Sequence, residues 1–429
     1  MSGPPPPLPM PTQHAAAPPR AVGVRWTVLA LLFAATTLCY LDRTVLAVLG
    51  PTLTEALHWS EGDYSHVVMA FQLAYAIGLA AAGRFLDVIG VRLGYALAVG
   101  AWSLAAMAHA LVGSVSGFMT ARFLLGLAEA GNFPAAIKSV AQWFPIRERA
   151  LATGIFNSGA NMGAILAPVL VPWVALHFGW RAAFLTTGLF SAAWIVWWWV
   201  KYRKPHERMD WSRGAIVLPP PGPVLAWWKL LGYRQTWGFM VGKFLTDPVW
   251  WFFLFWLPGY FSSRFSLDLS HLGLPLIVVY NLSVVGSVGG GWLPKGFIRL
   301  GMGLKPARLA AMLTCACLVV PMVFAGGLHS EWGAVALLGL AASAHQGWSA
   351  NIFTTPSDMF PAEYVGTVVS FGQVAGAAGG AIFAALTGHI IEITHSYAPL
   401  FLYAAFAYLA ALLLLRALAP GLKRALPEV

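Results

Sequence analysis

Four ionisable residues lie in stretches of the sequence that are otherwise apolar. Asp42 and Arg43 are adjacent in "CYLDRTVLAVL", and Arg122 and Glu129 occur in "ARFLLGLAEAG". An ionised side chain near the centre of a bilayer costs about 2.5 to 3.5 kcal/mol on the insertion scale. A chain that keeps four such residues is expected to use them, either as a buried ion network that locks helices together or in moving protons and charged solutes.

Helical spacing decides which of the four can face the same way. Arg122 and Glu129 are two helical turns apart and share one face. Asp42 and Arg43 are adjacent, about 100° apart around the helix axis, so they cannot both point at one partner. We expect Asp42 to lie near Arg122 and Arg43 to turn toward a carboxylate substrate, because a guanidinium binds a carboxylate in a bidentate fork and stays protonated.

Asp42 and Glu129 are the titratable members of this group. Burial favours the protonated form of a carboxyl, whereas a neighbouring arginine favours the carboxylate. A change in pairing, such as the arrival of an anionic substrate, would therefore change their affinity for protons. We predict that Asp42, Glu129 and Arg122 couple proton movement to substrate movement. Two carboxylates also allow two protons per monoanion, in which case the membrane potential would help import.

The sequence around these residues is that of an integral membrane protein. Of its 429 residues, 59% are hydrophobic and 10% are charged, whereas about a quarter of the residues of soluble domains are charged. Twelve apolar stretches of about 20 residues are long enough to cross a bilayer. They lie at residues 24–45, 63–82, 93–112, 117–137, 150–174, 181–200, 236–260, 271–293, 307–326, 332–354, 365–387 and 396–416. Short connections between them leave no room for a soluble catalytic domain.

The formal net charge of +10 indicates orientation in the membrane rather than nucleic-acid binding. Of the 26 lysines and arginines, only Arg181 and Arg264 are expected outside, while Arg43, Arg122 and Lys243 lie inside predicted spans. The others fall on the side of the N-terminus, as the positive-inside rule requires of a cytoplasmic face. An even number of spans then puts both termini in the cytoplasm.

The longest hydrophilic connection divides the predicted spans six and six. We predict an all-α membrane protein with a disordered Pro-rich extension over residues 1–22, six-helix bundles over 23–200 and 235–417, a cytoplasmic linker over 201–234, and a cytoplasmic tail over 418–429. "GRFLDVIGVRLG" and "GGWLPKGFIRLG" follow the second span of each half. This weak similarity indicates a parallel repeat, in which substrate binds near the midplane between the halves and access alternates.

The first of these segments resembles the loop 2–3 signature of the major facilitator superfamily. The matching residues are Gly83, Asp87, Gly90 and Arg92. The signature implies a glycine turn, with Asp87 near a helix N-terminus and Arg92 pairing across the cytoplasmic face. The chain departs from it at Val88, where many members carry a basic residue, and at Lys295, which takes the acidic position in the second-half copy.

Longer stretches resemble the anion:cation symporter branch of that superfamily, and most of all bacterial hexuronate or sugar-acid transporters. They are "YLDRTVLAV", "RFLLGLAEAGNFPAAIKSVAQWFPIRERALATGIFNSGANMGAILAPVL", "GKFLTDPVWWFFLFWLP" and "HQGWSANIFTTPSDMFP". The resemblance covers residues 24–416. It implies the twelve-helix major facilitator fold and import of a sugar-acid anion with protons. In sugar-acid members, the positions of Asp42 and Glu129 are the proton sites.

A sugar acid offers a carboxylate and several hydroxyls, so its site should combine amide, hydroxyl and aromatic groups. Besides Arg43, the candidates are Tyr40, Gln72, Tyr75, Asn157, Asn161, Trp251, His345, Gln346, Trp348, Ser349, Asn351, Thr354 and Gln373. The resemblance implies that the tyrosines of spans 1 and 2 line the site. Several relatives carry a glutamine where this chain has Ala160, and the adjacent Asn161 is the expected substitute. His345 is either a proton relay or a hydrogen-bonding group.

Further residues are assigned structural roles. Lys243 and Asp247 have i,i+4 spacing and can pair along a helix, or Asp247-Pro248 can cap a helix that restarts inside the span. Close helix packing is expected at Gly159, Gly163, Gly376, Gly379 and Gly380. The three cysteines show no metal or disulfide spacing and are expected to act as small apolar residues.

The leading hypothesis is a proton-coupled importer of a hexuronate such as glucuronate or galacturonate. It would act as a monomer without a cofactor, in the inner membrane of a bacterium. An alternative is a symporter of another organic anion, such as an aldonate or an aromatic or short carboxylate. A membrane enzyme or a nutrient sensor is a further alternative. Against an enzyme, the predicted outside loops offer only His177, Glu331 and Glu392, not a catalytic cluster.

Overall fold

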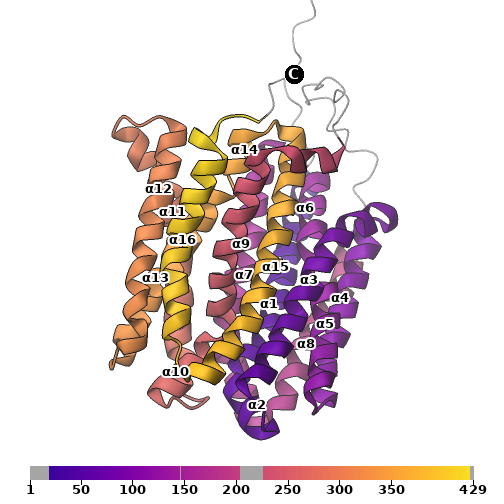
Figure 1. Cartoon of the computed structure of the whole chain (residues 1–429). Coiled ribbons are helices and arrows are strands. Elements are labelled where there is room, and N and C mark those ends of the chain that lie inside the picture. Colours follow the sequence, from indigo (N-terminus) through magenta and orange to yellow (C-terminus); the bar gives the residue numbers. More distant parts are fainter. Residues whose placement is uncertain (1–18, 145, 203–225, 426–429) are drawn as a thin grey trace, which may run out of the picture.

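The computed structural model describes residues 19–144, 146–202 and 226–425, and within them the chain is helical, with no strand (Figure 1). Helices satisfy their own backbone hydrogen bonds, which a lipid environment cannot do for them. Residues 1–18 of the predicted Pro-rich extension, most of the predicted linker and the last four residues of the tail lie outside the described residues. Residues 19–22 were predicted to be disordered, but they belong to the first helix, which begins at Pro19.

The helices follow one another with short connections. The α-helices are α1 (Pro19–Val48), α2 (Gly50–Leu57), α3 (Glu61–Ile89), α4 (Val91–Ala108), α5 (Val115–Glu129), α6 (Asn132–Trp143), α7 (Ile146–Phe178), α8 (Trp180–Lys201), α9 (Arg234–Phe255), α10 (Leu257–Phe265), α11 (Gly273–Arg299), α12 (Leu304–Val319), α13 (Glu331–Ile352), α14 (Thr355–Met359), α15 (Ala362–Thr394) and α16 (Ala398–Leu418). Short 3₁₀ helices lie at His109–Leu111, Trp227–Gly232, Val320–Gly327 and Pro420–Leu422.

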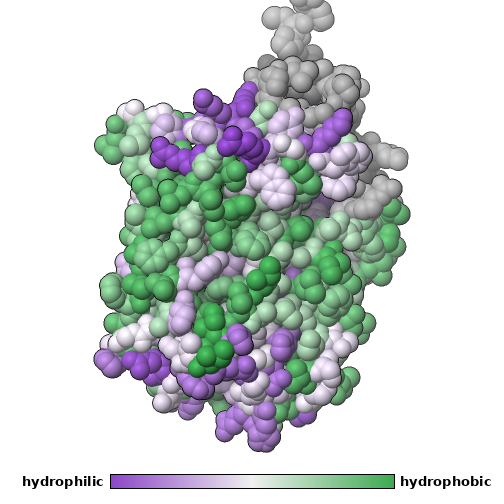
Figure 2. Space-filling model, viewed as in Figure 1, coloured by the Kyte–Doolittle hydropathy of each residue, from purple (hydrophilic) through white to green (hydrophobic). Residues whose placement is uncertain are grey.

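Nine helical segments of the described chain are long and apolar enough to cross a membrane. They coincide with nine of the predicted spans, and hydrophobic residues cover the middle of the face seen in Figure 2, with hydrophilic residues toward its two ends. The other three predicted spans correspond to α9, to α13, and to α5 together with α6. Of these, α5 and α6 are short, with 15 and 12 residues, and α9 and α13 carry buried polar side chains such as Lys243 and His345. The count of twelve spans stays a prediction.

Helix boundaries follow local capping chemistry. The side chain of Ser60 accepts a hydrogen bond from the backbone N–H of Asp63, and the Asp63 carboxylate accepts one from the N–H of Ser60, which forms a capping box at the start of α3. Gly90 has a φ of +83° and is the only residue between α3 and α4. A residue with a positive φ at this position favours glycine, so Gly90 forms the turn of the signature.

Glycines allow several helix pairs to approach closely. A Cβ on Gly163 of α7 would lie 2.4 Å from the Thr37 carbonyl oxygen of α1. On α15, a Cβ on Gly379 would lie 2.4 Å from the Phe244 carbonyl oxygen of α9. The predicted packing role of the glycines at 159, 163, 376, 379 and 380 is confirmed, because each would clash with the neighbouring helix if it carried a Cβ.

We predict that Gly163→Ala lowers the thermal stability of the protein in detergent, because the added methyl group forces α1 and α7 apart. Overpacking of this kind costs about 1 to 3 kcal/mol. Gly154→Ala, in the same helix, is the matched control, since a Cβ there meets nothing within 4 Å. It should leave the melting temperature unchanged or raise it. Equal melting temperatures for the two variants would contradict the packing role.

Segments far apart in the sequence meet at the end of the molecule that carries α2 and α10 (Figure 1). The Tyr64 hydroxyl donates to the Phe255 carbonyl oxygen at 2.6 Å, and the Gly62 N–H donates to the Glu392 carboxylate at 2.7 Å. A cavity of about 280 Å³ lies beside these contacts and is lined by Tyr64, Phe255 and Tyr397 among others. The contacts therefore close the molecule between its first and second parts at this end.

Candidate functional site

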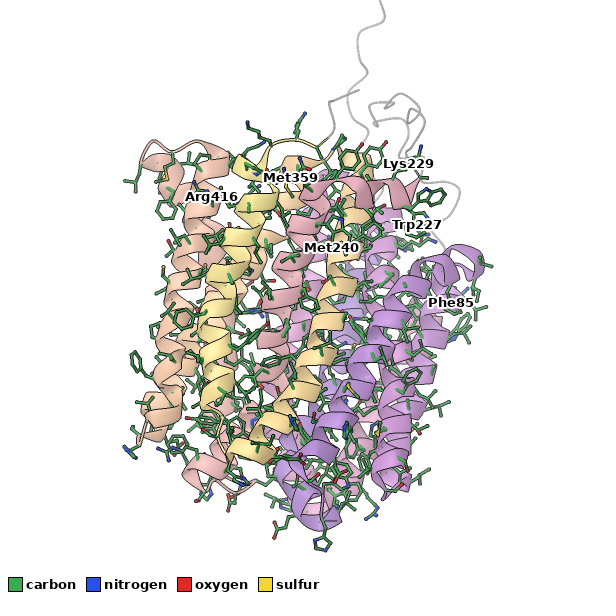
Figure 3. All side chains as sticks on the ribbon, in the orientation of Figure 1. Phe85, Trp227, Lys229, Met240, Met359 and Arg416 are labelled. Carbon is green, nitrogen blue, oxygen red and sulfur yellow. The ribbon has the colours of Figure 1, made fainter. Side chains whose placement is uncertain are left out.

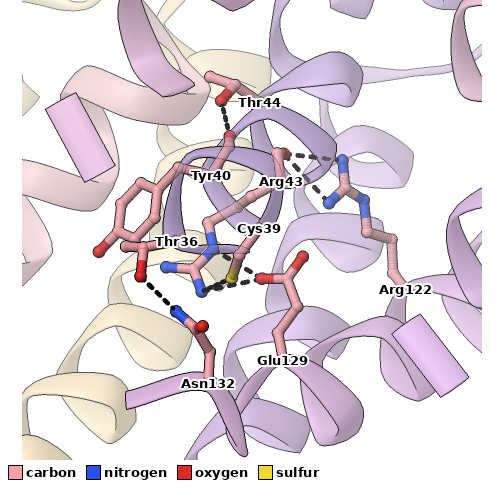
Figure 4. A network of polar contacts seen from close by, with 8 residues as sticks. All are labelled: Thr36, Cys39, Tyr40, Arg43, Thr44, Arg122, Glu129 and Asn132. Atoms are coloured by element: carbon pink, nitrogen blue, oxygen red, sulfur yellow. Dashed lines mark hydrogen bonds and ion pairs between the residues drawn. The ribbon is translucent and has the colours of Figure 1, made fainter. Parts of the chain in front are cut away.

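Arg43 of α1 forms a buried ion pair with Glu129 at the C-terminal end of α5 (Figure 4). Its Nε lies 2.9 Å and its Nη2 2.8 Å from the same Glu129 oxygen, Oε2. The side chains are 2% and 0% exposed. The sequence predicted a carboxylate substrate as the partner of Arg43, but in this structure the carboxylate is that of Glu129. The two opposite charges are buried, and their pairing offsets part of the desolvation cost.

Aromatic rings surround the Arg43 guanidinium. Its central carbon lies 4.5 Å from the ring centre of Tyr40, 4.8 Å from that of Tyr75, and 5.1 Å from those of Phe71 and Trp251. Electron-rich ring faces stabilise a cation at such distances. Trp251 belongs to α9, whereas the other three rings belong to α1 and α3. The cage therefore joins the first part of the chain to the second, and three of its rings were candidate substrate contacts.

Several buried polar atoms near this pair have no hydrogen-bond partner among the described residues. They are Arg43 Nη1, Glu129 Oε1, and both amide atoms of Gln72. A Cβ on Gly380 would lie 2.8 Å from Trp251 and 3.3 Å from Gln72. Gln72 therefore lies close to Trp251, one of the rings around Arg43. A buried polar group left unpaired costs about 1 to 3 kcal/mol. These atoms are therefore suited to receive a polar ligand or water.

Arg122 and Asp42 interact electrostatically, but they form no direct ion pair. Nη1 and Nη2 of Arg122 each donate to the backbone carbonyl oxygen of Arg43 at 3.2 Å. A carbonyl oxygen has two lone pairs, so it can accept these bonds in addition to its helical one. Among the described residues, no ion pair joins Arg122 to Asp42. Arg122 thus holds the backbone of α1 at the residue whose side chain binds Glu129.

Asp42 lies on a different face of α1 from Arg43, as its adjacency predicted. Its Oδ2 accepts a hydrogen bond of 2.6 Å from the hydroxyl of Ser191 on α8. Its Oδ1 has no partner among the described residues, and the residue is 2% exposed. The two carboxyls of the predicted proton pathway therefore sit in different surroundings: Glu129 is bound to a cation and Asp42 to a neutral hydroxyl.

Lys243 and Asp247 pair along α9, with Nζ 2.9 Å from Oδ1. The alternative, a helix restarting at Asp247-Pro248, is wrong, because α9 continues through Pro248 to Phe255. Lys243 Nζ also lies 4.0 Å from the ring centre of Phe353, the residue that follows the last residue of α13. The pair is mostly buried, with the two side chains 4% and 19% exposed, so it links α9 to its neighbours.

His345 and Trp348 lie in an aromatic group within the second part of the chain. The Nδ1 of His345 is 2.5 Å from the Tyr408 hydroxyl, and its ring is stacked on Trp250 with centres 5.2 Å apart. Trp348 is fully buried against the Tyr408 ring. Of the two roles considered for His345, the structure displays the hydrogen-bonding one.

The remaining amide and hydroxyl candidates do not all gather at the Arg43 cage. Asn351 donates from Nδ2 to the carbonyl oxygens of Gly290 and Gly347 at 2.8 Å each, so it ties α13 to α11. Thr354 donates to the Asn351 carbonyl oxygen at 2.6 Å. The other candidates are partly or fully exposed: Asn157 and Asn161 on α7, Gln346 and Ser349 on α13, and Gln373 on α15.

The loop signature is present, but with a different partner for its arginine. Gly83 lies inside α3, Gly90 forms the turn, and Arg92 donates from Nη2 to the Trp199 carbonyl oxygen of α8 at 3.1 Å. The predicted partner of Arg92 lay across the cytoplasmic face; the observed one lies at the end of a packed neighbouring helix. The side chain of Asp87 lies outside the described part of the structure.

Some members of the site were missed by reasoning from the sequence. Ser191 carries no charge and stands in an apolar run, so nothing in its pattern marked it as the partner of Asp42. Phe71 was overlooked beside the polar Gln72. Cys39, expected to be an inert apolar residue, lies one turn before Arg43, whose Nη2 donates weakly to its Sγ at 3.8 Å. Its i,i+4 spacing was the one signal that could have found it.

Comparisons with known proteins agree with this architecture. The Major Facilitator Superfamily matches residues 32–384. The hexuronate transporter of Escherichia coli strain K12 is 31% identical over 404 residues, which cover 91% of this chain and 93% of the relative. The galacturonate transporter of Dickeya chrysanthemi is 34% identical over 285 residues, covering 64% and 83%. The D-galactonate transporter of Escherichia coli O6:H1 is 26% identical over 397 residues, covering 88% and 92%.

Solved structures show the same fold. A D-xylose-proton symporter superposes with a TM-score of 0.72 at 14% sequence identity, covering 91% of this chain and 97% of the other. A bacterial homologue of the human lysosomal transporter Spinster gives 0.69 at 18% identity, covering 93% and 96%. The resemblance drawn from the sequence is confirmed: the chain is a multi-pass membrane transporter rather than an enzyme, and it belongs to the Major Facilitator Superfamily, among the relatives of its sugar-acid transporters.

Proposed function

We propose that the protein imports a sugar-acid monoanion, a hexuronate such as glucuronate or galacturonate, together with protons. The observation that carries this proposal is the Arg43–Glu129 ion pair inside an aromatic cage. Arg43 holds one oxygen of a carboxylate through two of its nitrogens, and that carboxylate is one the protein itself can protonate. The substrate carboxylate and Glu129 then compete for one guanidinium.

This competition supplies the coupling. A proton on Glu129 removes its charge and weakens its hold on Arg43, which then binds the substrate carboxylate. Loss of the proton restores the ion pair and expels the anion. The unpaired Arg43 Nη1 and Glu129 Oε1 are the atoms at which the substrate and the proton first arrive. Arg122 keeps the α1 backbone fixed while the partner of Arg43 changes.

The rings around Arg43 suit the rest of a hexuronate. Tyr40 and Tyr75 bring hydroxyls as well as aromatic faces, and Trp251 offers a broad face to the apolar side of a sugar ring. Gln72, with both amide atoms unpaired, is a hydrogen-bonding partner for sugar hydroxyls. The names of the relatives from Escherichia coli and Dickeya chrysanthemi, hexuronate and galacturonate transporter, support this choice of substrate.

Asp42 is the second proton site of this proposal. Its neutral partner Ser191 lets it be either charged or protonated without breaking an ion pair. Asp42 is adjacent to Arg43 on α1. A shift of this helix would therefore change the surroundings of both the Asp42 carboxyl and the Glu129 carboxyl that Arg43 binds. Two protons with one monoanion would carry a net positive charge inward, and the membrane potential would then drive import.

Transport proceeds by alternating access between two six-helix halves, residues 23–200 and 235–417, of a twelve-span bundle. The cage supports this, because Trp251 lies in the second half and its other rings lie in the first. The Tyr64–Phe255 and Gly62–Glu392 contacts would have to break for the site to open at the α2/α10 end. The distribution of lysine and arginine supports placing that end outside and both termini in the cytoplasm, in the inner membrane of a bacterium. The protein is proposed to act as a monomer.

Uptake into proteoliposomes tests the proposal. With the inside alkaline, we expect radiolabelled glucuronate or galacturonate to accumulate, and a protonophore to abolish the accumulation. For each coupled proton, a gradient of one pH unit supplies about 1.4 kcal/mol, or about tenfold accumulation.

Unlabelled galactonate, benzoate and lactate serve as competitors in the same vesicles. In a parallel experiment with radiolabelled galactonate, accumulation of galactonate but not of either hexuronate would replace the proposed substrate by an aldonate, as the name of one relative suggests. Accumulation driven by a sodium gradient at equal pH would overturn the proton coupling. Liposomes without protein and vesicles carrying Arg416→Gln, a change at an exposed arginine, are the controls.

A further inference from the structure

A second large cavity lies away from the Arg43 cage, at the α3–α4 turn. It has a volume of about 620 Å³ and is lined by residues 89–93 of the turn and the first turn of α4, by Gln142 of α6, and by Trp199 and Tyr202 at the end of α8. None of these residues contacts the Arg43–Glu129 pair. The transport site therefore does not account for this cavity.

The polar groups of the cavity are donors. Arg92 binds the Trp199 carbonyl oxygen through Nη2, while its Nε is buried without a partner among the described residues. The Tyr202 hydroxyl donates to Gln142 Oε1 at 3.0 Å, which fixes the amide and leaves its NH₂ group as a donor. The first turn of α4 carries no acidic residue, and its N-cap Gly90 offers no side chain to cap it. An arginine, an amide and a helix N-terminus together favour an anion.

Exposed apolar side chains lie around the cavity. Val88 is 71% exposed, and Leu93, Trp199 and Val200 are exposed beside it. Figure 3 shows Phe85, one turn before Val88, at the outer edge of the bundle and nearer to the end of the molecule where Arg416 lies than to the opposite end. The Arg92 guanidinium lies 4.7 Å from the ring centre of Trp199. Tryptophan and arginine side chains together are typical of the level of the lipid headgroups.

We propose that this cavity binds the headgroup of an anionic phospholipid. The phosphodiester would lie between the Arg92 guanidinium, the Gln142 amide and the first turn of α4, and the acyl chains would lie along Val88, Leu93 and Val200. Basic pockets between membrane helices on the cytoplasmic side are known to bind anionic lipid headgroups. A soluble phosphate would bring no chains to cover the apolar rim, so lipid is the occupant that satisfies both parts of the cavity.

Native mass spectrometry of the purified protein tests this site. The protein is delipidated and titrated with phosphatidylglycerol or with phosphatidylcholine of the same chains. We expect one tightly held phosphatidylglycerol, and a loss of its affinity of about tenfold or more in Arg92→Gln, as for a charge-assisted hydrogen bond. Arg416→Gln, which removes an exposed arginine at the end of α16, should leave the affinity unchanged.

Each outcome bears on the proposal. Equal affinity for the two lipids, or equal effects of Arg92→Gln and Arg416→Gln, would overturn it. Displacement of phosphatidylglycerol by millimolar inorganic phosphate would show an anion site that does not need a lipid. If Arg92→Gln does not fold, Arg92→Lys and Gln142→Leu provide the comparison: the lysine variant should keep part of the preference and the leucine variant should weaken it.

Discussion

Glu129→Gln should strongly reduce accumulation driven by a pH gradient while substrate binding survives. Glutamine keeps the shape of the protonated carboxyl but cannot release a proton, so Arg43 is left permanently available to the substrate. The variant should still exchange labelled for unlabelled hexuronate across the membrane. With a gradient of one pH unit, we expect its accumulation ratio to fall by about tenfold for each proton that Glu129 carries. Uptake and exchange in the same proteoliposomes make the measurement.

Glu129→Gln also removes one partner of a buried ion pair, so its effect on stability must be separated from its effect on transport. Removing one partner of a buried pair costs about 3 to 5 kcal/mol, because the other charge stays buried and unpaired. Glu129→Gln should therefore melt at a lower temperature than the wild type, and Glu129→Asp should melt between them. Arg43→Gln combined with Glu129→Gln should recover stability but not exchange. If Glu129→Gln accumulated substrate to the same ratio as the wild type, Glu129 would not be a coupling carboxyl.

Arg43→Lys should weaken substrate binding strongly even though the positive charge is kept. Arg43 uses Nε and Nη2 on one carboxylate oxygen and has Nη1 left over, and its flat guanidinium lies among four rings. An ammonium group is a point charge without this fork. Loss of one charge-assisted hydrogen bond, worth about 1.5 to 3 kcal/mol, corresponds to about 10- to 150-fold in Kd. Isothermal titration of the detergent-solubilised protein with glucuronate checks the value.

The matched control for this change is Arg416→Lys, an exposed arginine far from the cage in sequence. It should bind glucuronate like the wild type. Trp251→Phe is a useful companion, because it keeps an aromatic ring beside Arg43 while it reduces the face available to a sugar. Unchanged affinity for glucuronate in Arg43→Lys would contradict the role of Arg43 as the anchor of the substrate carboxylate. The Arg43–Glu129 pair would then have only a structural role.

Much of the fold could be predicted from the sequence, because lipid restricts the options of the backbone. Apolar runs in a chain with few charges can only be helices in a membrane, and their positions match the observed helices. Gly90 indicated a one-residue turn, because its positive φ disfavours a side chain. Gly163 indicated a close helix contact, because a side chain there would clash with α1. Where two local rules competed, as at Asp247-Pro248, the sequence left the choice open, and packing kept the helix continuous.

The sequence by itself determined which residues were too costly to be idle: Asp42, Arg43, Arg122 and Glu129, and the different directions of the first two. Only the tertiary structure decided their partners. Arg43 meets Glu129, and Asp42 meets a serine of α8. Helical periodicity fixes angles around one axis, but it contains no information about which neighbouring helix lies at each angle or at what height. Trp251 belongs to α9 and is further from Arg43 in sequence than Glu129 or Ser191. It reaches the Arg43 guanidinium only because the two parts of the chain pack together.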